Sequence, residues 1–180
     1  VYPGSVPGAL LVLSLAAPPA SAELHSLSAR LRVGGERVIG VEQPERFESV
    51  DLGLTWRLPW EHYGASGWGL RTRVLTSAGW MTGAEDSALV LSALPLLAFG
   101  SRDGRFTTDF GLGAALLSRH RFAQQDFGGY LRFALTVGVS VPLYRQVGLG
   151  YRFMHYSDAA LYGTDTIGAD FHMVALSYLF

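Results

Sequence analysis

The 180-residue chain contains no cysteine. A disulfide scaffold, a thiolate metal site and a cysteine nucleophile are therefore excluded. Charged residues are also scarce: they make up 16% of the chain, where about 25% is usual for a soluble domain. The formal net charge is -1 and no block of Lys or Arg occurs, which argues against nucleic acid as a partner.

Apolar residues, by contrast, account for 49% of the chain, and glycine occurs 22 times. Tyrosine, phenylalanine and tryptophan together supply 12%. A chain of this length suits one domain, large enough for a real core or a small closed barrel. The mixture of glycine and aromatic residues favours an all-β protein.

The N-terminal segment is predicted to be an export signal. "GALLVLSLAAPPASA" is an apolar run that ends in small residues, with Ala20-Ser21-Ala22 as the cleavage site before Glu23. The run is too short for a spanning helix, which needs about 20 residues. We therefore expect a signal peptide at 1–22 and a barrel domain at 23–180, outside the cytoplasm. A buried N-terminal strand or helix is the alternative, although the proline pair at 18–19 would break either.

After Glu23, apolar residues recur with period two, which is the strand signature. The cleanest segment is "YLRFALTVGVSVPL", whose apolar side chains alternate with Arg132, Ala134, Thr136, Gly138 and Ser140. One segment, "SALVLSALPLLAF", is apolar on both faces, so its orientation stays open. Eight segments of about ten residues are expected as strands, a length that suits a tilted membrane-crossing strand: 26–33, 47–60, 67–80, 87–99, 105–117, 130–143, 147–157 and 170–180.

The polar faces of these strands indicate which environment surrounds them. Arg71, Arg73 and Arg132 lie opposite the apolar rows, where a soluble sandwich or a lipocalin-like barrel needs apolar side chains. In a membrane barrel the apolar row meets lipid, while polar and small residues fill the interior. The connections are long after the first, fifth and seventh strands and short after the fourth and sixth. Long loops on one side and short turns on the other are typical of outer-membrane barrels. The sequence therefore predicts an eight-stranded antiparallel transmembrane β-barrel.

Three polar residues continue the apolar rows of the last two strands. His155 and Ser157 extend the row that contains Tyr151 and Phe153, and Asp170 extends the row that ends at Phe180. All three are thus expected on the lipid-facing surface at one rim. Ser as nucleophile, His as base and Asp as the group that orients the imidazole form an esterase triad, which is recognised by geometry and not by chain order. A polar rim that meets headgroups and water is the alternative interpretation.

The chain resembles the PagL-type outer-membrane lipid A 3-O-deacylases. "YRFMHYSDAAL" is similar to the family's His-x-Ser-Asn-Ala-Gly segment, and "FTTDFGLGAALLS", "FGGYLRFALTVGVSVPL" and "SVDLGLTW" are similar to its fifth, sixth and second strands. The resemblance implies an eight-stranded barrel in the bacterial outer membrane that cleaves the ester-linked acyl chain at position 3 of lipid A. It implies a Ser-His-acid triad near the extracellular rim, facing the outer leaflet, and no metal or other cofactor. Lipopolysaccharide would be the partner.

The resemblance assigns Ser157 as nucleophile, His155 as base and Asp170 in place of the family's Glu. Asp158 stands where the family has Asn, and Ala160 stands where it has Gly. Asp165 or Thr166 is nearest to the loop Asn that would help to hold the oxyanion. Ala160, Asp165 and Thr166 are therefore expected to contact the oxyanion or the substrate.

A carboxylate near the oxyanion would repel it, where a hydrogen-bond donor is worth several kcal/mol. His172, on the same face as Asp170, is an alternative donor or an interfacial rim residue. A non-catalytic small outer-membrane barrel, structural, adhesive or a degenerate relative of the enzyme, is therefore the alternative function.

Overall fold

The computed structural model describes residues 21–34, 37–38, 41–163 and 166–180. The predicted signal peptide lies almost wholly outside the described residues and stays a prediction. Within the described part of the chain, no helix is both long and apolar enough to cross a membrane.

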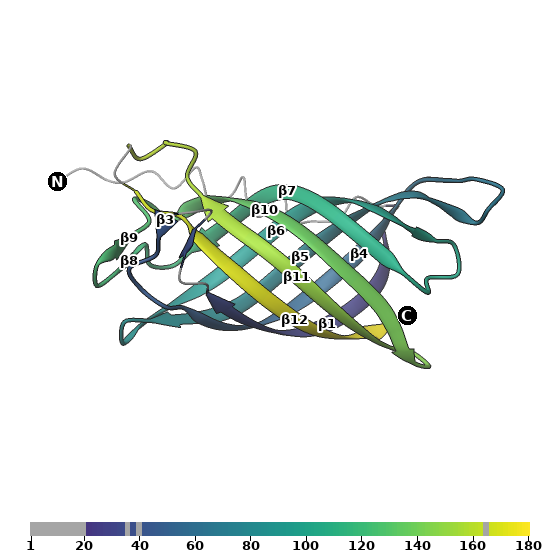
Figure 1. Ribbon diagram of the computed structural model, residues 1–180, viewed down its shortest axis with the longest axis horizontal. Helices are drawn as coiled ribbons and strands as arrows, with labels where there is room; N and C mark the ends of the chain where they lie inside the picture. The colour runs from purple at the N-terminus through teal and green to yellow at the C-terminus, as the bar shows by residue number, and fades with distance from the viewer. Residues whose placement is uncertain (1–20, 35–36, 39–40, 164–165) are drawn as a thin grey trace.

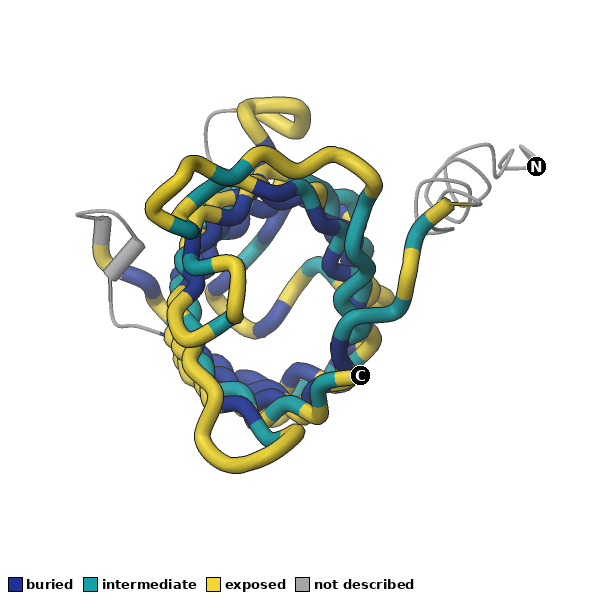
Figure 2. The backbone as a smooth tube through the Cα atoms, turned by 90° about the vertical axis from the view of Figure 1, so that its right-hand side faces the viewer, coloured by how far each residue is buried: buried dark blue, intermediate teal, exposed yellow. Residues whose placement is uncertain are grey.

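Eight long strands form one closed antiparallel barrel, as predicted. Consecutive long strands are neighbours around the barrel, and β1 pairs with β12 to close it, in a register that runs from Ser26↔Leu179 to Gly34↔Phe171. Figure 2 shows the closed ring along its axis. Its strands are β1 (Glu23–Gly34), β4 (Glu48–Tyr63), β5 (Trp68–Gly83), β6 (Asp86–Ser101), β7 (Thr107–Leu117), β10 (Leu131–Tyr144), β11 (Val147–Ser157) and β12 (Ala169–Leu179).

The prediction of about ten residues per strand is too short for half of the barrel. Strands β4, β5 and β6 have 16 residues each and β10 has 14. The β4–β5 hairpin continues past the rim of the barrel at the right of Figure 1, because ladder pairing persists out to Tyr63↔Gly69. The period-two pattern weakens there, since residues beyond the membrane need not alternate.

The two ends of the barrel differ in their connections. At one end, called the turn end, the strands are joined by the short segments 64–67, 102–106 and 145–146, and the C-terminus lies there too (Figure 1). At the other end, called the loop end, three of the four connections are long. Two of these hold small hairpins that the sequence pattern did not predict: β2 (Arg37–Val38) with β3 (Val41–Glu42), and β8 (Arg121–Phe122) with β9 (Gln125–Asp126).

The two faces of the strands separate as expected. On the outward rows, Leu31, Leu52 and Leu112 are about 60% exposed, whereas the inward-facing Arg71, Arg73 and Arg132 are 5%, 6% and 0% exposed. The ambiguous strand β6 places Leu94 and Leu96 inside. Its inward row also contains Ser92, whose hydroxyl lies 2.6 Å from that of Ser77, and Leu96 is opposite Arg73 in the register.

The expectation that polar and small residues fill the barrel holds for most of the lumen and is wrong at the loop end. At the loop end the lumen is closed by an aromatic plug, in which the ring of Phe47 lies 5.2, 5.6 and 6.3 Å from those of Phe122, Phe127 and Phe171. Phe47, Phe122 and Phe127 come from the long connections. Connections that fold back into the barrel carry no strand alternation, which is why the pattern missed them.

Directly behind the plug the lumen becomes polar, and it stays polar toward the other end. Asp51 forms ion pairs with both Arg30 and Arg32, and Arg152 lies 2.7 Å from Asp109. Glycine provides the room: a Cβ on Gly138 would stand 2.9 Å from the guanidinium carbon of Arg152. Arg30 is directly opposite Asp51 on the neighbouring strand, and Arg152 of β11 reaches past β10 to Asp109 of β7.

Candidate active site

His155 and Asp170 form a close pair on the outer surface at the loop end. They lie directly opposite each other in the β11–β12 register, and His155 Nδ1 is 2.6 Å from the Asp170 carboxylate. Their side chains are 15% and 6% exposed, so the pair is shielded from water more than a rim residue usually is. Two residues that are 15 positions apart in sequence are therefore joined by the strand pairing alone.

The same two strands anchor the pair from behind. Tyr156 and Phe171, each next in sequence to one member, point inward, are fully buried and place their rings 5.3 Å apart. Tyr156 also accepts a hydrogen bond of 2.5 Å from Arg32 across the lumen. Because side chains alternate across a strand, packing of the inward residues holds the backbone that presents the outward ones.

Ser157 is the last residue of β11 and lies two positions after His155 on the same row. It is half-buried and faces Phe133 of β10 in the register. Among the described residues, no hydrogen bond joins its hydroxyl to His155. Nδ1–H donation to Asp170 leaves His155 Nε2 as the acceptor, and side chains at i and i+2 stand about 7 Å apart at the backbone.

The connection after Ser157 is organised by the Asp158 carboxylate. It accepts hydrogen bonds from the backbone N–H groups of Ala160 and Tyr162, at 3.2 and 3.3 Å, and from the Thr166 hydroxyl at 2.7 Å. Burial would raise the pKa of Asp158, but these hydrogen bonds and the positive charge of Arg132 together lower it. Asp158 is thus an ionised, buried anchor of the loop.

This arrangement occupies groups that the sequence assigned to the oxyanion. The Ala160 N–H and the Thr166 hydroxyl are both directed at Asp158, and Asp165 lies outside the described residues. Ala159 and Ala160 adopt positive φ values of 49° and 63°, which non-glycine residues rarely do. Glycine would adopt these angles without strain, so alanine here is held by the loop's hydrogen bonds.

His172 is directed away from the pair. Its Nδ1 is 2.6 Å from the Tyr151 hydroxyl, and its ring lies 5.6 Å from that of Phe153. It occupies the outward row one step below Asp170, where Tyr and His side chains are common in membrane barrels. In this structure its hydrogen bond goes to Tyr151 and not to His155 or Ser157.

Two buried glutamines near the site were missed by sequence reasoning. The Gln43 side-chain carbonyl accepts a hydrogen bond of 3.4 Å from the backbone N–H of Asp170. Gln125, fully buried, donates to the carbonyl groups of Ile167 and Gly168 at 2.9 and 3.0 Å. Both come from long connections without a repeating pattern, so nothing in the sequence marked them.

In the part of the chain that the structure describes, no group of three His, Cys, Asp or Glu side chains is placed to hold a metal ion. The candidate site is therefore built from one imidazole, one carboxylate and one hydroxyl. It lies on the outer surface of a closed barrel whose outward rows are apolar. Such a protein belongs to the class of small membrane β-barrels with an outward-facing polar site.

Comparison with known proteins identifies the family. The family model for lipid A 3-O-deacylase (PagL) matches residues 48–179, and the chain belongs to this family of outer-membrane hydrolases. The lipid A deacylase PagL of Bordetella bronchiseptica is 25% identical over 122 residues, which cover 65% of this chain and 68% of the relative. The crystal structure of the outer membrane enzyme PagL aligns with a TM-score of 0.70 at 21% identity, over 85% of this chain and 98% of that one.

Proposed function

We propose that the chain is a lipid A 3-O-deacylase that uses Ser157, His155 and Asp170 as a triad on its lipid-facing surface. Membership of the family supports the reaction. The observation that carries the site is the His155–Asp170 pair at 2.6 Å, two residues from a serine on the same row. The substrate is the ester-linked acyl chain at position 3 of lipid A, in the outer leaflet of the outer membrane.

The chemistry follows from this geometry. Ser157 Oγ attacks the ester carbonyl carbon while His155 Nε2 takes its proton, and Asp170 stabilises the imidazolium that forms. The tetrahedral intermediate then expels the sugar oxygen, which receives the proton from His155. Water attacks the acyl-enzyme with His155 again as base, so the fatty acid leaves and the serine is restored. An apolar surface around the site suits a substrate whose acyl chains remain in the membrane.

One observation favours the alternative, a barrel of the same family that does not hydrolyse. Asp158 binds the Ala160 N–H and the Thr166 hydroxyl, which leaves these two donors unavailable to an oxyanion. A donor at that point is typically worth about 3–4 kcal/mol of transition-state stabilisation. Activity therefore requires that another donor serves the oxyanion or that substrate displaces Asp158.

Mass spectrometry of lipid A from a Gram-negative host that expresses the protein tests the proposal. We expect the loss of one ester-linked hydroxyacyl chain, and Ser157→Ala should abolish that loss. Ser66→Ala, an exposed serine in a turn at the other end, is the matched control and should remain active. Folding of each variant is checked by the shift in gel mobility on boiling.

Unchanged lipid A with folded wild-type protein would contradict the proposal as stated. The double change Asp158→Asn with Asp165→Asn then separates the two explanations. Hydrolysis gained by that variant indicates an enzyme disabled by carboxylates near its oxyanion site. Continued inactivity indicates a non-catalytic barrel.

A further inference from the structure

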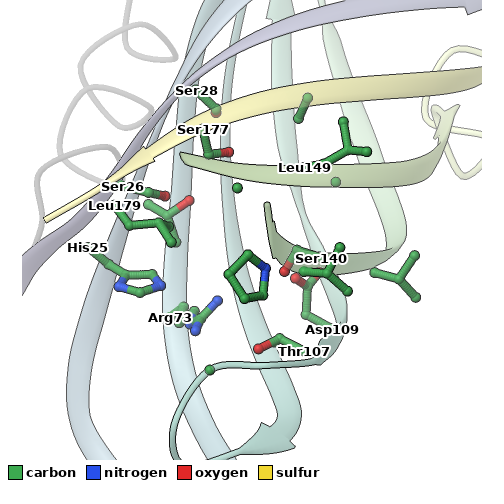
Figure 3. A pocket seen from close by; sticks show the side chains of 18 of the residues that line it. His25, Ser26, Ser28, Arg73, Thr107, Asp109, Ser140, Leu149, Ser177 and Leu179 are labelled. Carbon is green, nitrogen blue, oxygen red and sulfur yellow. The ribbon is translucent and has the colours of Figure 1, made fainter. Parts of the chain in front are cut away.

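The end of the lumen opposite His155 contains a cavity of about 350 Å³. It is lined by residues of the short turns, such as Arg102 and Arg145, and by the C-terminal Phe180. Figure 3 shows it from close by, with side chains of several strands directed into it. A volume of this size lies in the range of small-molecule sites in proteins.

The charge around this cavity is strongly unbalanced. Among the described residues that line it, seven are arginines and two, Asp103 and Asp109, are acidic. Both aspartates are already engaged: Asp109 with Arg152 at 2.7 Å, and Asp103 with the exposed Arg105 at 2.8 Å. Arg30 is paired with Asp51, which lies outside the lining. Within the described part of the chain, the other five arginines form no ion pair with a carboxylate: Arg57, Arg71, Arg73, Arg102 and Arg145.

Three of these arginines lie side by side on one sheet surface. Arg57 of β4 is directly opposite Arg73 of β5 in the register, and Arg71 follows two positions away on the same face. Like charges placed directly opposite on neighbouring strands destabilise a sheet. In the described chain none of the three forms an ion pair. Arg57 lies 3.2 Å from His25 Nδ1, Arg71 donates to the Thr107 hydroxyl at 3.0 Å, and Asp109 attracts Arg73 from a longer distance. These contacts offset the repulsion only in part, because none of them is a direct ion pair.

Arg73 is the most exceptional of the three. Arg73 is only 6% exposed, yet its side chain makes no hydrogen bond with any described residue. The Nε atoms of Arg57, Arg71 and Arg73 are all buried without a partner. Burial of an unpaired charged donor is costly, so such groups are normally satisfied by a partner. In Figure 3 Arg73 reaches into the cavity near His25 and Thr107.

We propose that this arginine cavity binds a phosphate group through Arg57, Arg71 and Arg73. A guanidinium matches pairs of phosphate oxygens. A phosphate dianion has more oxygens and more charge than a carboxylate, which suits it to engage three guanidiniums at once. The cavity is larger than one phosphate, so a small phosphomonoester also fits. The group comes either from a free phosphate compound on that side of the membrane or from the headgroup of a lipid. The site is independent of Ser157 and of the proposed deacylation.

Thermal unfolding of the refolded full-length barrel in neutral-detergent micelles tests the proposal. Inorganic phosphate should raise the unfolding temperature in a saturable manner, beyond the effect of sodium chloride at equal ionic strength. Arg73→Gln should weaken phosphate binding about ten-fold or more, because one charge-assisted hydrogen-bond partner is lost. Without phosphate, the same variant should unfold at a higher temperature than wild type, because a like-charge contact is removed.

Arg121→Gln is the control, since it removes an exposed arginine at the loop end that neither lines the cavity nor pairs with a residue that does. It should leave the phosphate response unchanged. Arg57→Gln repeats the test if Arg73→Gln does not fold. The proposal is overturned if wild type responds neither to inorganic phosphate, beyond the effect of sodium chloride, nor to short-chain phosphatidic acid, or if folded Arg73→Gln or Arg57→Gln responds like wild type.

Native mass spectrometry distinguishes the two sources of phosphate. The barrel is incubated separately with inorganic phosphate and with short-chain phosphatidic acid, each with wild type and Arg73→Gln. Retention of inorganic phosphate by wild type indicates a free ligand, while retention of the lipid alone indicates a headgroup. Either result must be lost in Arg73→Gln, and equal retention by both proteins contradicts the site.

Discussion

The lumen of the barrel is filled at one end and hollow at the other. At the loop end, aromatic residues from the long connections fold into the lumen and close it. At the turn end the connections are too short to fold inward, and arginines line a cavity of about 350 Å³. The outer surface of the plugged end carries the His155–Asp170 pair. A filled interior gives the rigid support that a site needs on its outer face.

The sharpest difference between the ends is which side of the membrane each one faces. Because the chain has no cysteine, a single introduced cysteine is a clean reporter. Ala159→Cys, exposed in the 158–168 connection, should be labelled by a membrane-impermeant maleimide on intact cells. Ala65→Cys, exposed in the turn 64–67 at the other end, should be labelled only after the outer membrane is permeabilised. The reverse pattern would place the candidate site at the periplasmic surface.

The next largest effect concerns chemistry at the loop end. His155→Ala should lower the deacylation rate about 10⁴-fold or more, since members of a triad act as a unit. His62→Ala, an exposed histidine near the turn end, should have no effect. The rate is measured on purified lipid A in micelles.

Asp170 should contribute less than His155, because it orients the base and does not itself react. Asp170→Ala should therefore retain more activity than His155→Ala in the same assay, and Asp170→Glu should retain the most of the three. Activity of Asp170→Ala equal to wild type would show that the 2.6 Å contact has no part in the reaction.

A smaller effect is expected on stability, at the level where the filled and hollow parts of the lumen meet. Leu75 and Leu94 are neighbours in the β5–β6 register and both are buried, but Leu75 borders the arginine cavity and Leu94 does not. Leu94→Ala should lower the free energy of unfolding by about 3 kcal/mol, whereas water can enter the space left by Leu75→Ala and reduce its cost. Equal losses in urea unfolding would indicate that packing does not differ between the two regions.

The smallest effect is expected from pH. The pKa of Asp158 is lowered in the folded protein, so its contribution to stability is present above the unfolded value of about 3.9 and is lost as pH falls through the folded value. Asp158→Asn should therefore be less stable than wild type at neutral pH, by about 1 kcal/mol. The difference in unfolding temperature should disappear in acid. A difference that persists at low pH would mean that Asp158 acts through packing and not through its charge.

Much of the fold follows from the alternation of apolar and polar residues along each strand. Alternation along "YLRFALTVGVSVPL" and its counterparts predicted the eight strands and the inward positions of Arg71, Arg73 and Arg132. The same alternation placed His155, Ser157 and Asp170 on the outward rows of two neighbouring strands, and in the structure His155 and Asp170 meet. Strand lengths were underestimated, because pairing beyond the membrane does not require alternation. The aromatic plug and both glutamines were missed, because they come from connections without a period.

The sequence by itself thus determined which side of every strand except β6 faces out, since a period of two leaves only two choices and lipid requires the apolar one. It also determined that a histidine, a serine and an aspartate share the outer row. Only the tertiary structure decided the rest. Closure of the barrel set the register that joins His155 to Asp170, folding of the loops directed Ala160 and Thr166 at Asp158, and strand pairing brought Arg57 opposite Arg73. These contacts join residues distant in sequence, and local patterns contain no information on which distant partner a side chain will meet.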